Sequence, residues 1–394
     1  MNLLIGTRIL DLTQMLAGPF GTMMLADMGA EVIKIEEPGI GDRTRTMGPH
    51  FVAGTSAYFV SVNRNKKSMT LNLKENAGRE IFYDLVKKSD VVFDNFRPGV
   101  LERLKCDYES LKKVNPKIIC CSISAFGQNG PYREMPAFDL SIQALSGVMS
   151  YTGEPERAPV RMGIPMGDLA GAMYAAFAVA AALHSRDEKG NGCRIDISLL
   201  DSITALHTYV AQYYFFSGEL PKPIGSGHQS VVPYQAFRTK DMYIVIAVYT
   251  DKFWEGLCKA LGVEHLINDP KFATNEKRRD HRQELIKILS EAFEKKNGAE
   301  WLALLEKEGV PCGPINTLDK TLSDRQLLER NMVVELDIPD YGKLKTLGNP
   351  VKVEGSKERF VHSPKLGEHT EMILRDILGY SEEDVKKLKS IKAI

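Results

Sequence analysis

The sequence predicts an α/β protein whose larger domain holds a parallel sheet and whose smaller domain is α+β. Strand and helix signals alternate from residue 8 to residue 199, which is typical of βαβ units. A glycine- and proline-rich segment follows at 217–227, and beyond it the pattern changes. A chain of 394 residues is also too long for one compact core. We therefore expect the smaller domain at 223–330, between segments 1–222 and 331–394.

Apolar runs and the residues that end them define the first elements. Residues 8–12 predict a strand that a glycine–proline pair ends, 20–28 predict a helix that Gly29 ends, and 31–36 predict the next strand. The same alternation predicts strands at 68–73, 91–96 and 117–124 and helices at 76–88 and 100–114. This order favours parallel strands with helices on the faces of the sheet.

An alanine-rich segment at 168–186 predicts a long helix. Its small side chains would let other helices or a second subunit pack closely, so we expect it to be fully buried. A polar turn at 187–192, a strand at 193–199 and a helix from Asp201 follow.

The second half predicts a hairpin followed by amphipathic helices. Its strands are 231–237 and 242–248, its helices are 251–261, 281–295 and 299–308, and the last segment carries strands at 333–336 and 343–347 and a helix at 368–378.

Composition narrows the class of partner and the compartment. The 51 basic and 51 acidic residues balance, which argues against nucleic acid as the main partner. The six cysteines form no CxxC pair and show no zinc spacing, which favours a reducing compartment. We see no signal peptide in the first residues and no apolar run long enough to span a membrane, so we expect a cytoplasmic protein without a membrane partner.

The most informative segment is 163–171, where Asp168 lies between flanking glycines at the start of the alanine-rich helix. Small neighbours let a ligand approach closely, and a helix start offers free N–H groups to negative charge. On local sequence alone, capping of the helix by Asp168 is the more common role.

Several common chemistries lack their motifs. The turn after the first strand has no GxGxxG and carries Pro19 where a phosphate-binding turn needs N–H donors, so we expect no NAD. There is no Walker A sequence, no HExxH and no GxSxG, and the eight histidines are scattered. We expect neither a metal site nor Ser–His hydrolysis.

A set of short motifs nevertheless resembles one family over nearly the whole chain. The motifs lie at 11–19, 29–36, 41–42, 63–68, 94–99, 127–132, 137–140, 167–168, 309–314 and 366–370. Their number, order and spacing resemble the family III CoA-transferases, which include formyl-CoA and carnitine CoA-transferases. The resemblance implies an interlocked homodimer. Each subunit would have a Rossmann-like, CoA-binding large domain built from both chain ends.

The resemblance places the catalytic aspartate at Asp168. With an ordinary pKa of about 3.9 its carboxylate would be ionised without the help of a base. It would attack an acyl-CoA thioester, form a mixed anhydride and then an aspartyl-CoA thioester, and pass CoA to an acceptor carboxylic acid. Backbone N–H groups near Asp168 would stabilise each oxyanion.

The resemblance also implies contacts with coenzyme A. These map onto Leu71, Asn72, Leu73, Lys74, Asn95, Phe96, Arg97, Arg103, Ala137 and Phe138. Lys74 and Arg103 would hold phosphates, and the loop Gly225-Ser226-Gly227 would shield the intermediate from water. The chain departs from the formyl-CoA enzyme at Leu16, where that enzyme has glutamine, and at Glu37, where it has arginine, so a formyl/oxalate substrate pair is in doubt.

Two alternatives remain open at this stage. A 2-methylacyl-CoA racemase looks similar, but its catalytic histidine aligns with Phe138, which cannot transfer a proton. The other alternative is a protein that binds acyl-CoA without catalysis, against which the presence of Asp168 counts.

Overall fold

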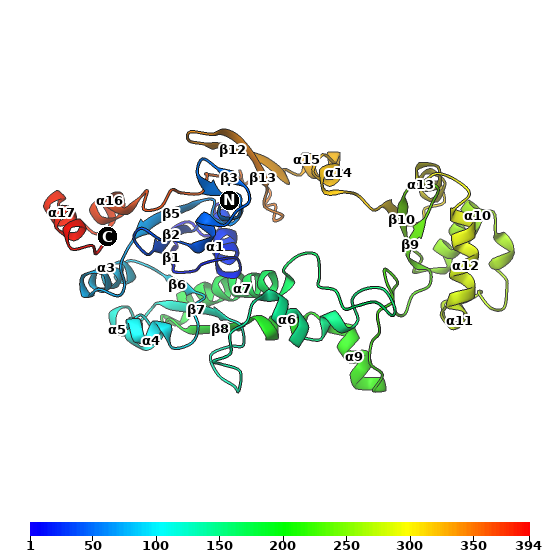
Figure 1. The fold of residues 1–394 in the computed structure, drawn as a ribbon, viewed down its shortest axis with the longest axis horizontal. Coiled ribbons are helices and arrows are strands. Elements are labelled where there is room, and N and C mark those ends of the chain that lie inside the picture. Colours follow the sequence, from blue (N-terminus) through cyan, green and yellow to red (C-terminus); the bar gives the residue numbers. More distant parts are fainter. The chain divides into compact units, whose positions relative to one another are not determined.

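The computed structural model describes residues 1–394, apart from the side chain of Lys189, and divides into two compact units (Figure 1). The first unit comprises residues 1–147, 162–212 and 326–394, and the second comprises 148–161 and 213–325. The first unit thus contains both chain ends. Segment 148–161 lies inside the predicted larger domain, but the structure groups it with the second unit.

A six-stranded sheet forms the centre of the first unit, and all its neighbouring strands are parallel, as predicted. Its order is β5-β2-β1-β6-β7-β8. The strands are β1 (Arg8–Asp11), β2 (Glu31–Glu36), β5 (Lys66–Thr70), β6 (Val91–Asp94), β7 (Ile119–Ser124) and β8 (Arg194–Ser198). The chain winds outward in both directions from the β1–β6 pair. Ligands of such sheets bind at this switch point, beyond the carboxyl ends of the strands.

One face of the sheet carries the main apolar core of this unit. Because side chains alternate along a strand, Leu10 and Ile33 point to the same face. There they join a buried cluster with α3 (Asn76–Lys87), α5 (Tyr108–Val114) and residues near the carboxyl end of the chain.

Helices α1 (Ala17–Asp27) and α7 (Met166–Lys189) pack on each other and on the opposite face (Figure 1). Gly21 allows this close approach, since a Cβ atom there would lie 3.1 Å from the carbonyl oxygen of Ala172. Helix α1 begins at Ala17 rather than at residue 20, because Pro19 fits the first turn of a helix, where its missing N–H is not needed.

Helix α7 buries only one face. Ala172, Ala175 and Val179 are buried against the sheet and α1, whereas Phe177 and Met173 are 73% and 43% exposed. The prediction of full burial is therefore wrong for the single chain. The length and apolar composition of α7 would suit a membrane span, but its buried face packs as that of a core helix does.

One predicted helix is divided in the structure, and another changes its helix type without a break. The segment 100–114 forms α4 (Val100–Leu104) and α5, because Lys105 between them has φ of 57°. The final helix becomes α16 (Thr370–Met372) and the π-helical η4 (Ile373–Ile377), with α17 (Glu382–Ser390) beyond it.

Further elements are η1 (Arg43–Thr46), β3 (Phe51–Val52), β4 (Thr55–Ser56), α2 (Ala57–Val62), α6 (Asp139–Leu145), α8 (Leu199–Ala205), α9 (Thr208–Ser217), α15 (Arg325–Glu329), and the hairpin of β12 (Val333–Ile338) and β13 (Gly342–Leu347).

The second unit contains a three-stranded antiparallel sheet, β11-β10-β9, with helices packed on it. The predicted hairpin is confirmed as β9 (Tyr234–Arg238) and β10 (Tyr243–Ala247). Its core includes Phe237, Phe293 and Trp301 in aromatic contact. The remaining elements are η2 (Val148–Ser150), α10 (Asp251–Leu261), η3 (Glu264–Leu266), α11 (Asn275–Asp280), α12 (Arg282–Phe293), α13 (Gly298–Lys307), β11 (Cys312–Pro314) and α14 (Leu318–Leu322).

Candidate active site

Asp168 lines a cavity of about 240 Å³ at the carboxyl edge of the sheet. The walls come from 15–17 after β1, 95–98 after β6, 123–125 at the end of β7, and the segment 133–138. We call this space the Asp168 cavity. It lies at the switch point of the sheet, where ligands of this architecture bind.

Asp168 does not cap its own helix. Residue Pro165 is the N-cap of α7 and makes no side-chain hydrogen bond. Instead, Oδ1 of Asp139 accepts hydrogen bonds from the N–H groups of Gly167 (2.8 Å) and Asp168 (3.3 Å). Its Oδ2 accepts one from Nε2 of Gln143 at 2.6 Å. The N–H groups that the sequence suggested as oxyanion donors are therefore already bonded to a carboxylate.

Burial raises the pKa of Asp168 to about 7, and repulsion from the Asp139 carboxylate adds to the rise. The expectation of an ordinary pKa is therefore wrong, because removal from water disfavours the charged form of a carboxyl group. At neutral pH a large fraction of Asp168 is protonated in the chain alone.

At the start of α1 the available backbone donors are the N–H groups of Ala17 and Gly18, because Pro19 has none and Phe20 already donates to Leu16. Leu16 and Ala17 line the cavity, and no side chain caps this end of the helix. The first N–H groups of a helix have no intrahelical acceptor and carry the positive end of its dipole. They are suited to an oxyanion that develops in the cavity.

A second cavity of about 310 Å³ contains most of the other predicted residues. We call it the Lys74 cavity. Its lining includes Leu71, Asn72, Leu73, Lys74, Phe96 and Arg103. Phe96 also lines the Asp168 cavity, so the two cavities border the same side chain.

The remaining predicted CoA residues line the Asp168 cavity. They are Asn95, Arg97, Ala137 and Phe138, and the last is 75% exposed. The structure thus places every predicted CoA residue along one of two cavities, while its contact with CoA stays a prediction. Lys74 is exposed and its Nζ donates to Glu37 Oε1 at 2.7 Å, so a phosphate at Lys74 would compete with that carboxylate.

Asn95 has a structural connection that the sequence did not suggest. Its Oδ1 accepts from the N–H of Gln14 at 2.9 Å, and its Nδ2 donates to the carbonyl oxygen of Gln14 at 2.7 Å. The side chain therefore ties the loop after β6 to the loop after β1, across the switch point.

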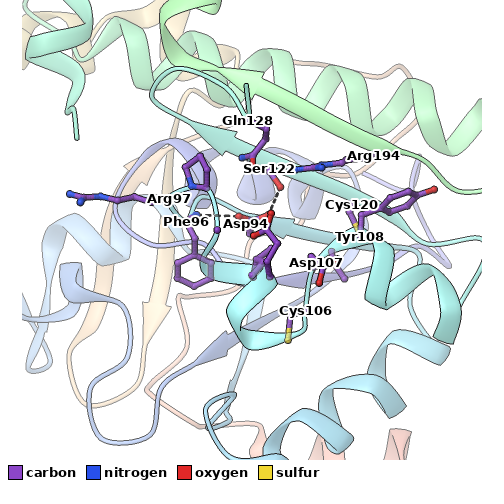
Figure 2. Close-up of a pocket in the computed structure, with 15 residues that line it drawn as sticks. Asp94, Phe96, Arg97, Cys106, Asp107, Tyr108, Cys120, Ser122, Gln128 and Arg194 are labelled. Atoms are coloured by element: carbon purple, nitrogen blue, oxygen red, sulfur yellow. Dashed lines mark hydrogen bonds between the residues drawn. The ribbon is translucent and has the colours of Figure 1, made fainter. Parts of the chain in front are cut away.

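A third, smaller pocket of about 20 Å³ also borders Phe96 (Figure 2). Asp94 in this pocket accepts hydrogen bonds from Ser122 Oγ (2.6 Å) and from the N–H of Phe96 (3.1 Å). Burial raises the pKa of Asp94 to about 6. Figure 2 shows Arg97 extending away from Asp94. The space suits about one water molecule. The hydrogen bond from the N–H of Phe96 to Asp94 holds the backbone of Phe96 in place.

The predicted loop Gly225-Ser226-Gly227 lies in the second unit. The N–H of Gly225 donates to the carbonyl oxygen of Gly153 at 2.9 Å, and Oγ of Ser226 accepts from the N–H of Ala236 at 3.0 Å. The first two residues of the loop are therefore held within their own unit, and the shielding role of the loop stays a prediction.

Sequence reasoning did not single out Arg133, which lines the Asp168 cavity. One Nη atom pairs with Glu134 at 3.0 Å, while its buried Nε has no hydrogen-bond partner among the described residues. The sequence signal that could have identified Arg133 is its positive charge close to the predicted CoA residues Ala137 and Phe138.

Known proteins similar to this chain identify its family. The model of the family described as CoA-transferase family III matches residues 4–370. Succinyl-CoA:glutarate CoA-transferase of Mus musculus is 44% identical over 98% of this chain and 89% of its own length. Acetyl-CoA:oxalate CoA-transferase of Acetobacter aceti is 40% identical over 92% of each chain. A CAIB/BAIF family protein from Brucella suis has a solved structure with a TM-score of 0.85 and 38% identity over 95% of this chain and 99% of its own. The chain therefore belongs to CoA-transferase family III and is a CoA-transferase.

Proposed function

We propose that Asp168 is the nucleophile through which CoA passes from donor to acceptor. A carboxylate oxygen of Asp168 attacks the thioester carbonyl, the C–S bond breaks, and CoA leaves as a thiolate from a mixed anhydride. The thiolate then attacks the aspartyl carbonyl and releases the donor acid as its carboxylate. This step leaves an aspartyl-CoA thioester.

The second half of the reaction reverses these steps with another acid. The acceptor carboxylate attacks the aspartyl carbonyl and displaces the thiolate, which gives a second anhydride. The thiolate attacks the carbonyl of the acceptor, so that acceptor-CoA forms and Asp168 regains its carboxylate. The uncapped start of α1 would stabilise the oxyanions in place of the N–H groups that Asp139 occupies.

One observation carries this proposal: the carboxylate of Asp168 lines a cavity that shares Phe96 with the Lys74 cavity. A CoA molecule with its phosphates near Lys74 and Arg103 would pass Phe96 to bring its thioester to Asp168. The exposed Phe138 in the same wall carries no titratable proton, which favours transfer over racemisation.

We further propose that both exchanged acids are dicarboxylic, with succinyl-CoA as donor and a five-carbon acid such as glutarate as acceptor. Arg97 and Arg133 line the cavity of Asp168. A guanidinium group there would bind the carboxylate that does not react. The mouse relative is named for these two acids. The Acetobacter relative is named for a dicarboxylic acceptor, oxalate, although its donor, acetyl-CoA, carries a monocarboxylic acid.

The functional form that we propose is an interlocked homodimer with a Rossmann-like, CoA-binding large domain. The strand order of the sheet supports the Rossmann-like assignment. The exposed apolar face of α7 supports association with a second copy, because a single chain rarely leaves such a face in water. We also propose a cytoplasmic location, in line with six free cysteines.

Trapping of the covalent intermediate tests the nucleophile. The protein is incubated with succinyl-CoA and then with hydroxylamine, and peptides are mapped by mass. We expect a hydroxamate on the peptide that contains Asp168, and no succinyl-CoA:glutarate exchange in Asp168→Ala. Asp201→Ala, which removes an exposed acid from the first turn of α8, is the matched control. Full exchange by Asp168→Ala would refute the mechanism.

A further inference from the structure

The loop between β1 and α1 adopts a conformation that its residues do not favour on their own. Met15 has φ of 70°, in the left-handed region that non-glycine residues rarely adopt. Met15, Leu16 and Ala17 form one wall of the Asp168 cavity. Strained backbone of this kind persists only where the surrounding structure holds it in place.

Two buried, oppositely charged side chains hold this loop. Oδ1 of Asp42 accepts from the N–H of Met15 at 3.2 Å, and Nζ of Lys34 donates to the carbonyl oxygen of Thr13 at 2.6 Å. Lys34 Nζ and Asp42 Oδ2 lie 3.0 Å apart, and both side chains are fully buried. The ion pair thus bonds to the loop on both sides of Gln14.

Asp42 is itself held by further hydrogen bonds to residues outside the loop. The N–H and Oγ1 of Thr44 donate to Asp42 Oδ1 at 2.9 and 2.8 Å. The N–H of Asp42 donates to Glu36 Oε2 at 2.9 Å, and Arg45 binds both oxygens of that carboxylate. Asp42 therefore cannot follow the loop if the loop moves.

Both members of the pair stay charged at neutral pH. Burial alone would raise the pKa of Asp42, but Lys34 and the bonds from Thr44 outweigh it and lower the pKa. Burial would lower the pKa of Lys34, yet Asp11, Asp42 and Glu36 raise it. A buried pair of this kind is weak evidence for stability, because desolvation offsets much of its attraction, and it is better suited to specifying one conformation.

We propose that the Lys34–Asp42 ion pair is a positioning device for catalysis, which holds residues 13–16 so that the start of α1 faces Asp168. The inference rests on the proposed function of the Asp168 cavity. Neither side chain lines that cavity, so both act through the backbone of the loop. Misplacement of such a wall slows the chemical step more than it weakens the binding of CoA.

The experiment removes the charges as a pair, so that no single charge is left buried. In Lys34→Met/Asp42→Asn the oxygen that accepts from Met15 is kept, while the ion pair and the bond to Thr13 are lost. We expect kcat for succinyl-CoA:glutarate exchange to fall roughly tenfold to a hundredfold, as misplaced catalytic groups do. The Kd for CoA should change less than about threefold, a shift well below the roughly tenfold that corresponds to 1.4 kcal/mol.

The chain offers a matched control at the other end of α1. Arg64 and Asp27 form a second buried ion pair there, with Nη2 and Oδ2 2.6 Å apart. Arg64→Met/Asp27→Asn should change the melting temperature about as much as Lys34→Met/Asp42→Asn does, but leave kcat of the folded fraction unchanged. Equal kcat in the two double variants would overturn the positioning role. Absence of exchange in the unmodified protein would instead overturn the proposed function.

Discussion

In the proposed mechanism, the carboxyl group of Asp168 sets the pH range in which the reaction can start. Burial and the neighbouring Asp139 raise its pKa to about 7, and only the ionised form is nucleophilic. The rate of covalent labelling by succinyl-CoA should therefore rise with pH and level off above about pH 7, with a slope near tenfold per unit well below it. Rapid-quench labelling across pH 5–9 measures this.

Removing the charge of Asp139 should lower the pKa of Asp168. Asp139→Asn keeps an oxygen for the N–H groups of Gly167 and Asp168 but removes the repulsion. The midpoint of the pH profile should move to lower pH. A midpoint that stays in place, or moves upward, would show that Asp139 does not influence Asp168 through its charge.

The same raised pKa predicts how stability depends on pH. Between the ordinary value of 3.8 and about 7, the folded chain binds a proton that the unfolded chain has lost. Stability due to this group is therefore present at low pH and is lost as pH rises towards 7. At one pKa unit per about 1.4 kcal/mol, the loss is at most about 4 kcal/mol.

Asp168→Asn should therefore stabilise the protein more at pH 8 than at pH 5. Chemical denaturation at both pH values measures the difference, with Asp201→Asn, at an exposed acid, as the control. An equal change at the two pH values would contradict the raised pKa.

Arg133 provides a test of acceptor selectivity. If its guanidinium binds the distal carboxylate, Arg133→Met should lower kcat/KM for glutarate by roughly tenfold or more, the value of one charge-assisted contact. Transfer to butyrate, which lacks the second carboxylate, should change little. Glu134→Gln, which frees Arg133 of its partner, should leave glutarate transfer intact or improve it. An equal fall for both acceptors, with a raised KM for succinyl-CoA, would assign Arg133 to CoA instead.

For single residues, the sequence could indicate which ones belong to the site, but not their protonation or their hydrogen bonds. The motif around Asp168 identified the candidate nucleophile, yet its pKa depends on burial and on Asp139, 29 residues away. Likewise the motif predicted that Asn95 contacts CoA, but it did not indicate the hydrogen bonds to Gln14, which join positions 81 residues apart. Contacts of this kind arise only when strands β1 and β6 become neighbours in the sheet.

At the scale of elements, the two loops at the switch point act together. The side chain of Asn95 bonds both polar groups of the Gln14 backbone, and these loops border the Asp168 and Lys74 cavities. Asn95→Ala should lower the free energy of unfolding by about 1–3 kcal/mol, the cost of unpaired backbone groups. It should also weaken CoA binding and slow labelling together, as measured by calorimetry and mass spectrometry.

Asn115→Ala is the matched control for Asn95→Ala. Nδ2 of Asn115 donates to the carbonyl oxygens of Val86 and Ser89, both at 3.0 Å, so its amide also ties two segments together. We expect similar destabilisation with unchanged CoA binding. Loss of CoA binding in both variants would mean that general destabilisation causes the loss, and not the broken hydrogen bonds between Asn95 and Gln14.

The type of most elements could be predicted because the spacing of apolar residues reflects which face of a helix or strand is buried. The boundaries of the elements depended on single residues. The parallel strands and α7 follow from such runs. The break between α4 and α5 depends on the left-handed backbone of Lys105, which its side chain does not signal. Helix α11 is a polar segment of six residues whose Arg278 becomes fully buried by bonds to Val232 and Phe272, and no periodicity indicates that.

At the scale of the whole molecule, the predicted parallel sheet and the change of pattern after residue 216 were enough to predict an α/β protein with two parts. The assignment of 148–161 to the second unit was not predictable, because it depends on contacts with residues such as Gly225 that are distant in sequence. Likewise, the exposure of Phe177 on α7 could not be read from a segment in which alanine dominates.

The exposed face of α7 predicts that the chain assembles with a second copy. Phe177, Met173 and Tyr174 are 73%, 43% and 39% exposed on a helix whose other side is fully packed. Covering large apolar side chains stabilises association by about 25 cal/mol per Å². We therefore expect a homodimer in sedimentation experiments at micromolar concentration. Phe177→Asp would place a charge in the interface and should give monomer or aggregate in place of dimer.

The control for this prediction is a charge reversal elsewhere on the surface. Lys387→Asp on α17 changes an exposed side chain and should leave both sedimentation and activity unchanged. A fully active monomer of the unmodified chain would contradict the proposed dimer while leaving the chemistry of Asp168 untouched. The assembly and the mechanism are thus tested separately, because the carboxylate and its cavity are formed within one chain.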